Sequence, residues 1–213
     1  MPSSQLISGF LPGPAGDLEY LLQAPAAPAA TRAALICHPH PLHGGTLHTR
    51  IVFHLARGFQ ERGMPALRFN FRGVGKSAGT HAFGWGEVDD VAAALAFLHA
   101  RCSLPIVLAG FSFGAVTALR YLERQNDGRI ERLVAAGVPA DRESLPVSLA
   151  WRGPKLLISG DHDEFAQASR LEAYFQSLEP PKRMLWFNGA DHFLNGHMDE
   201  LRRRLGENLD FDQ

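Results

Sequence analysis

The sequence has few cysteines, almost no net charge and no long apolar run, and each shortage excludes a class of protein. Cys37 and Cys102 are the only cysteines, so no disulfide framework is indicated and both are expected to be packed or idle thiols. The 21 basic and 22 acidic side chains give a net charge of -1, which provides no basic field for nucleic acid and no polybasic patch for a membrane. No apolar run reaches transmembrane length, and the first ten residues lack a charged segment followed by an apolar one. We therefore expect a cytoplasmic protein.

Short apolar segments alternate with amphipathic ones, which predicts an α/β fold with a mostly parallel sheet and helices on both faces. With 213 residues, the chain is expected to form a single domain, 1–213, with ample core. The expected strands are residues 6–10, 18–23, 33–37, 66–71, 106–111, 133–138, 156–159 and 184–187. The expected helices are residues 50–62, 87–101, 113–123, 166–178 and 198–205. An Ala/Pro stretch at residues 24–30 is expected to form a surface turn, too short for a linker between domains.

The sequence Gly110-Phe111-Ser112-Phe113-Gly114 lies between an apolar segment and a helix-forming segment. A G-x-S-x-G sequence between a strand and a helix is typical of a nucleophile elbow. Such a turn strains the backbone of the serine, and glycines two residues to either side leave room for the reversal. Ser112 is therefore the candidate nucleophile. The alternative is a strand end that happens to contain glycines, since short motifs of this kind also occur by chance.

A reactive serine needs a base and a group that orients the base, and in this fold the chain order is serine, acid, histidine. A predicted strand at residues 155–160 leads into three carboxylates, which are Asp161, Asp163 and Glu164. A later predicted strand leads into His192. Ser112, the carboxylates and His192 thus follow the carboxyl ends of strands, where open parallel sheets place their active sites. The spacing leaves open which of the three carboxylates faces His192.

Four segments give the chain a resemblance to a known family. Residues 38–46, 68–75, 110–114 and 189–193 resemble those of compact bacterial serine hydrolases of the α/β-hydrolase superfamily, and the resemblance covers nearly the whole chain. It implies an α/β-hydrolase fold. It also implies that the acid is the third residue after the glycine that ends the strand, which is Asp163, with Asp161 as the fallback.

An acyl-transfer site also needs two N–H donors for the oxyanion. One is expected from Phe113, the residue after the nucleophile, and the other from the loop after the strand at residues 33–37. Pro39 and Pro41 have no N–H, which leaves His40 first and Leu42 next. In similar hydrolases a His-Gly-x segment ends this strand and the residue after the glycine donates. In this chain Pro39 replaces that glycine, so His40 takes the position of the donor.

The connection from Pro139 to Lys155 is too short to build a helical lid, so the site is expected to be open. Its walls are expected from residues 40–46, 80–85 and 145–151. An open site of this kind suits small or short-acyl esters better than long-chain lipids, which need large apolar grooves.

Two other motifs suggest different chemistry. Residues 73–77 contain the Gly-Lys-Ser of a phosphate-binding loop, but position 70 is asparagine where that pattern needs glycine, and Gly79 interrupts any following helix. His38 and His40 could coordinate a metal ion, but the prolines beside them make a stiff loop and no carboxylate cluster lies nearby.

The sequence therefore predicts a carboxylesterase-like serine hydrolase that cleaves small or short-acyl esters or thioesters through an acyl-enzyme intermediate. Ser112 would attack, His192 would act as base and Asp163 would orient it, without a metal or organic cofactor. The expected partner is a small-molecule ester, not nucleic acid or a membrane, and the protein is expected to be a monomer or homodimer. The alternatives are a non-catalytic binding protein on the same fold and a small peptidase or amidase.

Overall fold

The computed structural model describes residues 5–24, 30–146 and 148–212, so residues 25–29 of the expected surface turn lie outside the described part. The strands are β1 (Gln5–Leu11), β2 (Leu18–Ala24), β3 (Ala33–Cys37), β4 (Ala66–Phe69), β5 (Ile106–Phe111), β6 (Ile130–Ala136), β7 (Lys155–Gly160) and β8 (Lys182–Phe187). The helices are α1 (Arg50–Glu61), α2 (Gly86–Cys102), α3 (Phe113–Arg124), α4 (Ala168–Ser177) and α5 (Met198–Asn208), with a short 3₁₀ helix at Pro41–His43. Within the described residues, no helix is long and apolar enough to cross a membrane.

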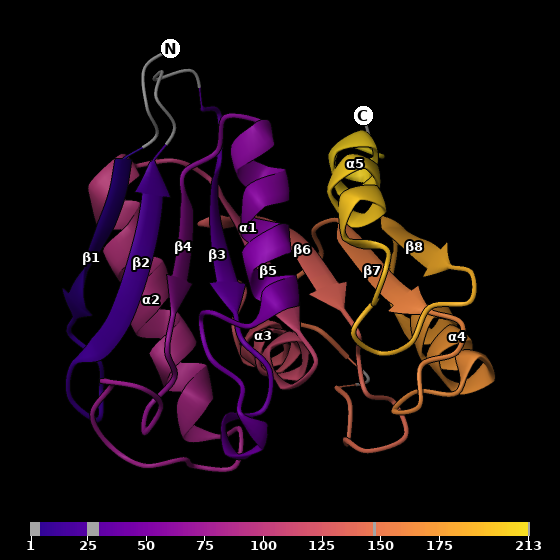
Figure 1. Cartoon of the computed structure of the whole chain (residues 1–213), viewed down its shortest axis with the longest axis horizontal. Helices are drawn as coiled ribbons and strands as arrows, with labels where there is room; N and C mark the ends of the chain where they lie inside the picture. The colour runs from indigo at the N-terminus through magenta and orange to yellow at the C-terminus, as the bar shows by residue number, and fades with distance from the viewer. Residues whose placement is uncertain (1–4, 25–29, 147, 213) are drawn as a thin grey trace.

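The strands form one sheet in the order β1-β2-β4-β3-β5-β6-β7-β8. Strand β2 runs antiparallel to both of its neighbours, and all pairs from β4 to β8 are parallel. Helices α1 and α5 cover one face of the sheet, and α2, α3 and α4 cover the other (Figure 1). The mostly parallel sheet with helices on both faces confirms the predicted fold class.

Alternation along the buried strands explains the two helical layers. In β3, Leu35 and Cys37 belong to the apolar cluster under α2 and α3, whereas Ala34 and Ile36 belong to the cluster under α1 and α5. Successive side chains of a strand point to opposite faces, so a strand buried on both faces reads as a continuous apolar run. The runs at β3, β5 and β7 were recognisable for this reason.

The parallel strands bring the candidate residues to one edge of the sheet. Cys37 at the end of β3 pairs in register with Gly110 near the end of β5, and Gly160 at the end of β7 pairs with Phe187 at the end of β8. The loops that follow these strands therefore emerge side by side. Between β6 and β7 the described residues of the connection form turns and bends but no helix, which confirms the absence of a lid.

Candidate active site

The turn between β5 and α3 has the geometry of a nucleophile elbow. Ser112 has φ 54° and ψ -121°, a strained conformation for a residue with a side chain. Its N–H donates to the carbonyl of Ala136 at 2.9 Å, which ties the turn to the end of β6. The strained serine lies between the last residue of a strand and the first residue of a helix, as the motif predicted.

The two glycines of the motif are required by close approach of the backbone. A Cβ atom at Gly110 would overlap the carbonyl group of Gly114, and a Cβ atom at Gly114 would overlap the carbonyl of Cys37. Neither glycine has a positive φ, so glycine is needed at these positions because a side chain has no room, not because of its backbone freedom. The elbow and the end of β3 thus pack main chain against main chain.

Ser112, His192 and Asp163 lie in consecutive contact. The Nε2 atom of His192 is 3.1 Å from the Oγ of Ser112, and its Nδ1 atom is 2.8 Å from Oδ2 of Asp163. The histidine is 3% exposed and the aspartate 6%. A proton on Nδ1 facing the carboxylate leaves Nε2 free to accept the serine proton. This arrangement can generate a serine nucleophile.

The other two carboxylates of the segment make different contacts. Oδ1 of Asp161 accepts the N–H of Gly189 at 2.6 Å, and Oε2 of Glu164 accepts the backbone N–H of His192 at 3.2 Å. Asp163 also accepts the N–H of Phe165 at 2.8 Å through its second oxygen, which fixes the carboxylate. Of the three, Asp163 is the one that contacts the imidazole.

Aromatic rings surround the imidazole of His192. The ring of Phe165 lies 4.6 Å away between centroids, that of Phe111 4.9 Å and that of Phe193 5.2 Å. Gly137 comes close on another side, because a Cβ atom there would lie 3.2 Å from Cε1 of His192. Packing of this kind restricts the ring to one orientation. The sequence analysis had not identified Phe165 as a site residue, because nothing in its local pattern separates it from a core aromatic.

Two residues that line the cavity beside Ser112 have backbone N–H groups with no acceptor within the described residues. The N–H of Phe113 is the first of α3, so no helical carbonyl lies behind it. The N–H of His40 donates to no acceptor within the described residues. Both residues line the cavity that contains Ser112. They can therefore donate to a negatively charged oxygen that forms there.

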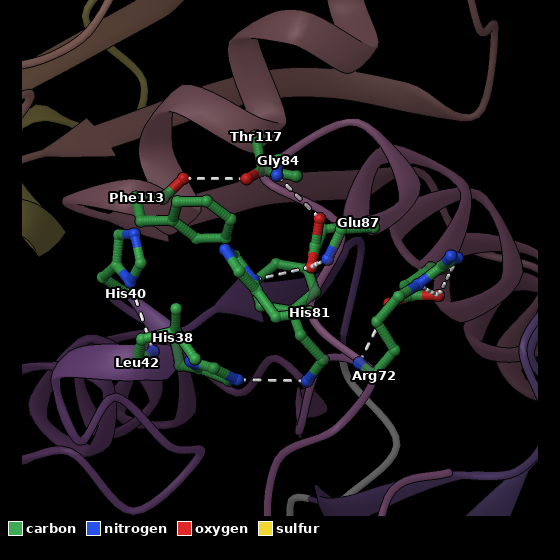
Figure 2. A network of polar contacts seen from close by, with 12 residues as sticks. His38, His40, Leu42, Arg72, His81, Gly84, Glu87, Phe113 and Thr117 are labelled. Atoms are coloured by element: carbon green, nitrogen blue, oxygen red, sulfur yellow. Dashed lines mark hydrogen bonds and ion pairs between the residues drawn. The ribbon is translucent and has the colours of Figure 1, made fainter. Parts of the chain in front are cut away.

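His38 holds the peptide that carries the second of these N–H groups. Its Nδ1 atom lies 2.6 Å from the carbonyl oxygen of Pro39. Its Nε2 atom accepts the N–H of Phe71 at 3.0 Å (Figure 2). Burial lowers the pKa of His38 to about 4, so the ring is neutral with its proton on Nδ1. The carbonyl and the N–H of a trans peptide point in opposite directions, so the N–H of His40 points away from His38. Both ring nitrogens are engaged, which does not fit a metal ligand.

A second group of contacts supports His40 from behind. The imidazole of His81 lies 5.2 Å from that of His40, and its Nδ1 atom is 2.9 Å from Oε1 of Glu87 (Figure 2). The Glu87 carboxylate is fully buried and accepts the N–H groups of Ala82 at 2.7 Å and Gly84 at 2.8 Å. Glu87 thus holds the loop at residues 80–86 against the start of α2. The side chain of His81 is 8% exposed, so this loop histidine is part of the packing around the site.

A cavity of about 640 Å³ opens beside Ser112. It is lined by Pro39, His40, His43, Gly44, Gly45, Thr49, Ser112, Phe113, Pro139, Arg142, Glu143, Phe165, His192 and Phe193. The expected wall at residues 40–46 is confirmed. The described residues at 80–85 and 145–151 do not line it, so these two expected walls are wrong. Glu87 holds the first segment through Ala82 and Gly84, and Leu149 and Trp151 of the second are buried in the core.

The segment with the Gly-Lys-Ser sequence is a structural turn. The hydroxyl of Ser77 donates to the carbonyl of Asn70 at 2.7 Å and accepts the N–H of Glu19 at 2.9 Å. The next helix, α2, does not begin until Gly86. A phosphate-binding loop needs a helix that starts at the loop, so this segment does not form one.

Comparison with known proteins shows the family of the chain. Residues 38–147 match the family described as serine aminopeptidase, S33. An α/β serine hydrolase homologue from Coxiella burnetii is 37% identical, covers 95% of this chain and 97% of its own, and superposes with a TM-score of 0.87. A serine hydrolase without a lid from Xanthomonas campestris is 30% identical, covers 96% of this chain and 94% of its own, and has a TM-score of 0.85.

More distant structures share the fold alone. An esterase from Pyrococcus furiosus is 18% identical, covers 98% of this chain and 93% of its own, and has a TM-score of 0.81. At this identity the likeness shows the fold and carries no statement about substrate. The matches in sequence and structure together show that this chain belongs to the α/β serine hydrolase family and has a lid-free α/β-hydrolase fold.

Proposed function

We propose that the protein hydrolyses small or short-acyl carboxylic esters through an acyl-enzyme intermediate on Ser112. The observation that carries the proposal is the pair of contacts from His192, at 3.1 Å to the serine hydroxyl and at 2.8 Å to the buried Asp163 carboxylate. A serine on a strained elbow with this partner is the arrangement that acyl transfer requires.

The proposed reaction has two halves. In the first, Oγ of Ser112 attacks the ester carbonyl carbon while its proton passes to Nε2 of His192, and the same proton then goes to the departing alkoxide. In the second, water attacks the acyl group, gives its proton to His192, and the carboxylic acid leaves as the serine recovers a proton. Asp163 keeps the imidazole in the productive tautomer and stabilises its positive charge in both halves.

Negative charge develops on the carbonyl oxygen in each half. The N–H groups of Phe113 and His40 would donate to that oxygen, and the positive end of the α3 dipole acts in the same direction. Loss of one such donor typically costs about 2.7 to 4 kcal/mol of transition-state stabilisation. A rigid donor pair is therefore a large part of the proposed rate enhancement.

The cavity favours short acyl groups. Phe113, Phe165 and Phe193 offer apolar surface close to Ser112, but no lid extends that surface outward. Each methylene contributes about 0.8 kcal/mol of binding only where apolar wall exists to bury it. We expect the gain in kcat/KM to stop after a few carbons, with no rise in rate when the substrate forms an emulsion.

An aminopeptidase is the alternative that the family description suggests. Such an enzyme must bind the ammonium group of a peptide, which calls for a free carboxylate near the nucleophile. Within the described residues, Glu143 is the carboxylate that lines the cavity, and its Oε2 already lies 3.0 Å from the guanidinium of Arg120. This pairing favours ester over aminoacyl amide.

The test compares p-nitrophenyl esters of two to twelve carbons with an aminoacyl p-nitroanilide, and adds covalent labelling by a fluorophosphonate. Ser112→Ala should lose labelling and lower kcat by about 10³-fold or more, because a nucleophile has been removed. Ser177→Ala, which changes an exposed serine on α4, is the matched control and should behave as wild type. Undiminished labelling of Ser112→Ala would overturn the assignment, and efficient cleavage of the anilide would favour the peptidase.

A further inference from the structure

The cavity beside Ser112 contains one cation that no carboxylate neutralises. Arg142 is the arginine and Glu143 the carboxylate among the residues that line this cavity. Glu143 pairs with Arg120 at 3.0 Å. Arg142 forms no ion pair within the described part of the chain. Its positive charge therefore faces the cavity and the solvent above it.

Arg142 stands next to the reacting groups. Its guanidinium carbon lies 5.9 Å from the centroid of the Phe165 ring, and that ring lies 4.6 Å from the imidazole of His192. Contact with an aromatic face restrains a guanidinium group and leaves its edge free to donate hydrogen bonds. The ring of Phe165 is thus a neighbour of both Arg142 and the proposed base.

The nearest carboxylate in sequence is directed elsewhere. Asp141 accepts the N–H of Gln167 at 2.7 Å through one oxygen and pairs with Arg170 at 3.0 Å through the other. These contacts fasten Asp141 to the start of α4. Hydrogen bonds from Gln167 and Arg170, and a smaller attraction to Arg142, lower the pKa of Asp141. No ion pair joins Asp141 to Arg142 within the described residues.

The opposite wall adds no negative charge. His40 and His43 lie there with ring centroids 4.6 Å apart. Burial lowers the pKa of His40, and charge on His43 or His81 would lower it further, while Glu143 and Glu87 act weakly in the other direction. Arg142 is thus the arginine of the cavity wall, and it has no ion pair within the described residues.

We infer that the preferred substrate is an ester that carries a carboxylate, which binds to the guanidinium of Arg142 while the ester carbonyl lies at Ser112. A guanidinium edge matches a carboxylate with two parallel hydrogen bonds, and such pairs are stronger than bonds between neutral groups. The inference rests on the proposed ester hydrolysis and specifies its substrate class.

The experiment uses pairs of esters that differ in charge but hardly in shape. Monomethyl succinate is compared with methyl levulinate, which has a methyl ketone in place of the carboxylate and so tests a charge on the acyl side. Acetoxyacetate is compared with acetoxyacetone, which tests a charge on the alcohol side. Hydrolysis is followed by pH-stat titration at low and high salt, and kcat and KM are obtained for each ester.

Wild type should prefer the charged member of at least one pair by about tenfold in kcat/KM, mainly through KM. High salt should reduce the preference, because the pair is partly exposed. Arg142→Gln should abolish the preference, because kcat/KM should fall much more for the charged member of a pair than for the neutral one. Arg142→Lys should retain part of it, since the charge remains but the planar edge does not. Arg152→Gln, an exposed arginine of the same connection that does not line the cavity, should keep it in full.

Two different failures can be told apart. If wild type cleaves neutral p-nitrophenyl esters through Ser112 but does not distinguish the members of either pair, the carboxylate inference is wrong and the proposed function stands. The same holds if Arg142→Gln slows charged and neutral esters equally. If no ester is cleaved and Ser112 is not labelled, the proposed function itself fails.

Discussion

Two amide substitutions at His38 can separate its contact to Pro39 from its contact to Phe71. In His38→Asn the amide nitrogen takes about the place of Nδ1 and can still donate to the Pro39 carbonyl, but nothing accepts the N–H of Phe71. In His38→Gln the amide oxygen takes about the place of Nε2 and can accept that N–H, but the donor to Pro39 is lost. If the role of His38 is to orient the Pro39–His40 peptide, kcat should fall much more in His38→Gln.

The expected loss of kcat follows from the role of the Pro39–His40 peptide, whose N–H is the proposed second oxyanion donor. Complete loss of an oxyanion donor costs about 2.7 to 4 kcal/mol, and in His38→Gln the N–H of His40 is still present but no longer held in place. A smaller loss of about 10- to 100-fold in kcat is therefore expected, with KM little changed. His38→Asn should stay within about threefold of wild type. Each variant loses one buried hydrogen bond, so both should lower the free energy of unfolding by about 1 to 3 kcal/mol.

The pH dependence of stability provides an independent check on the same residue. The pKa of His38 is about 4 in the folded protein and 6.5 in the unfolded chain, so the unfolded chain binds the proton first as pH falls. The stability that depends on a neutral His38 is present above pH 6.5 and is lost as pH falls toward 4, by about 3 kcal/mol in all. The amide variants cannot titrate, so their deficit relative to wild type should shrink over this range.

The assays are steady-state hydrolysis of a short p-nitrophenyl ester, inhibition by a boronic acid that mimics the tetrahedral intermediate, and urea unfolding at several pH values. In His38→Gln, inhibition should weaken in proportion to the loss of kcat, because both depend on the oxyanion donors. Equal losses of kcat in the two variants would refute the reasoning, since the common defect would then be lower stability and not the orientation of the peptide.

Two further predictions concern carboxylates. Asp163→Asn should lower kcat by about 10⁴-fold, because the imidazole loses the group that selects its tautomer. Asp161→Asn should lower kcat only a few fold. The reverse order in ester hydrolysis would show that Asp163 is not the acid. Asp127 accepts hydrogen bonds from Arg129 and from Tyr121, which outweigh its burial and lower its pKa to about 2. The stabilisation that ionised Asp127 provides should be present above pH 4 and lost as pH falls toward 2. Asp127→Asn should therefore lower the free energy of unfolding by about 1 to 2 kcal/mol at pH 7, after solvent screening. A deficit in urea unfolding that persists at pH 2 would contradict this.

The parts of the molecule that could be predicted from sequence have local signals. Strands β3 and β5 are apolar runs buried on both faces, and their predicted and observed bounds agree. The elbow is encoded within five residues, because Gly110 and Gly114 are needed where the backbone passes itself. Strand β6 was placed about three residues too late, since its first residues alternate in burial and include charged side chains.

The cavity walls could not be predicted in the same way. Arg142 and Phe165 approach each other only because the connections after β6 and β7 fold toward the same edge of the sheet. The position of His81 depends on Glu87, and a glutamate on a helix is normally read as exposed. Two backbone N–H groups donate to that carboxylate, and the imidazole of His81 lies 2.9 Å from it. Such a combination has no signature in the order of residues.

The replacement of the usual glycine by Pro39 also has a physical explanation. A residue before proline is confined to extended conformations, and both His38 and His40 precede a proline. His40 has φ -54° and ψ 121°, within that confined region. Gly45 folds back so closely that a Cβ atom there would overlap the carbonyl of Pro39, and Gly114 meets the carbonyl of His38 from the side of the elbow. Pro39 and Pro41 therefore restrict the backbone dihedrals of His38 and His40 already in the unfolded chain. In the folded chain, Gly45 and Gly114 leave room for the carbonyl groups of these same residues. That restriction lowers the entropy lost on holding the His40 N–H beside Ser112.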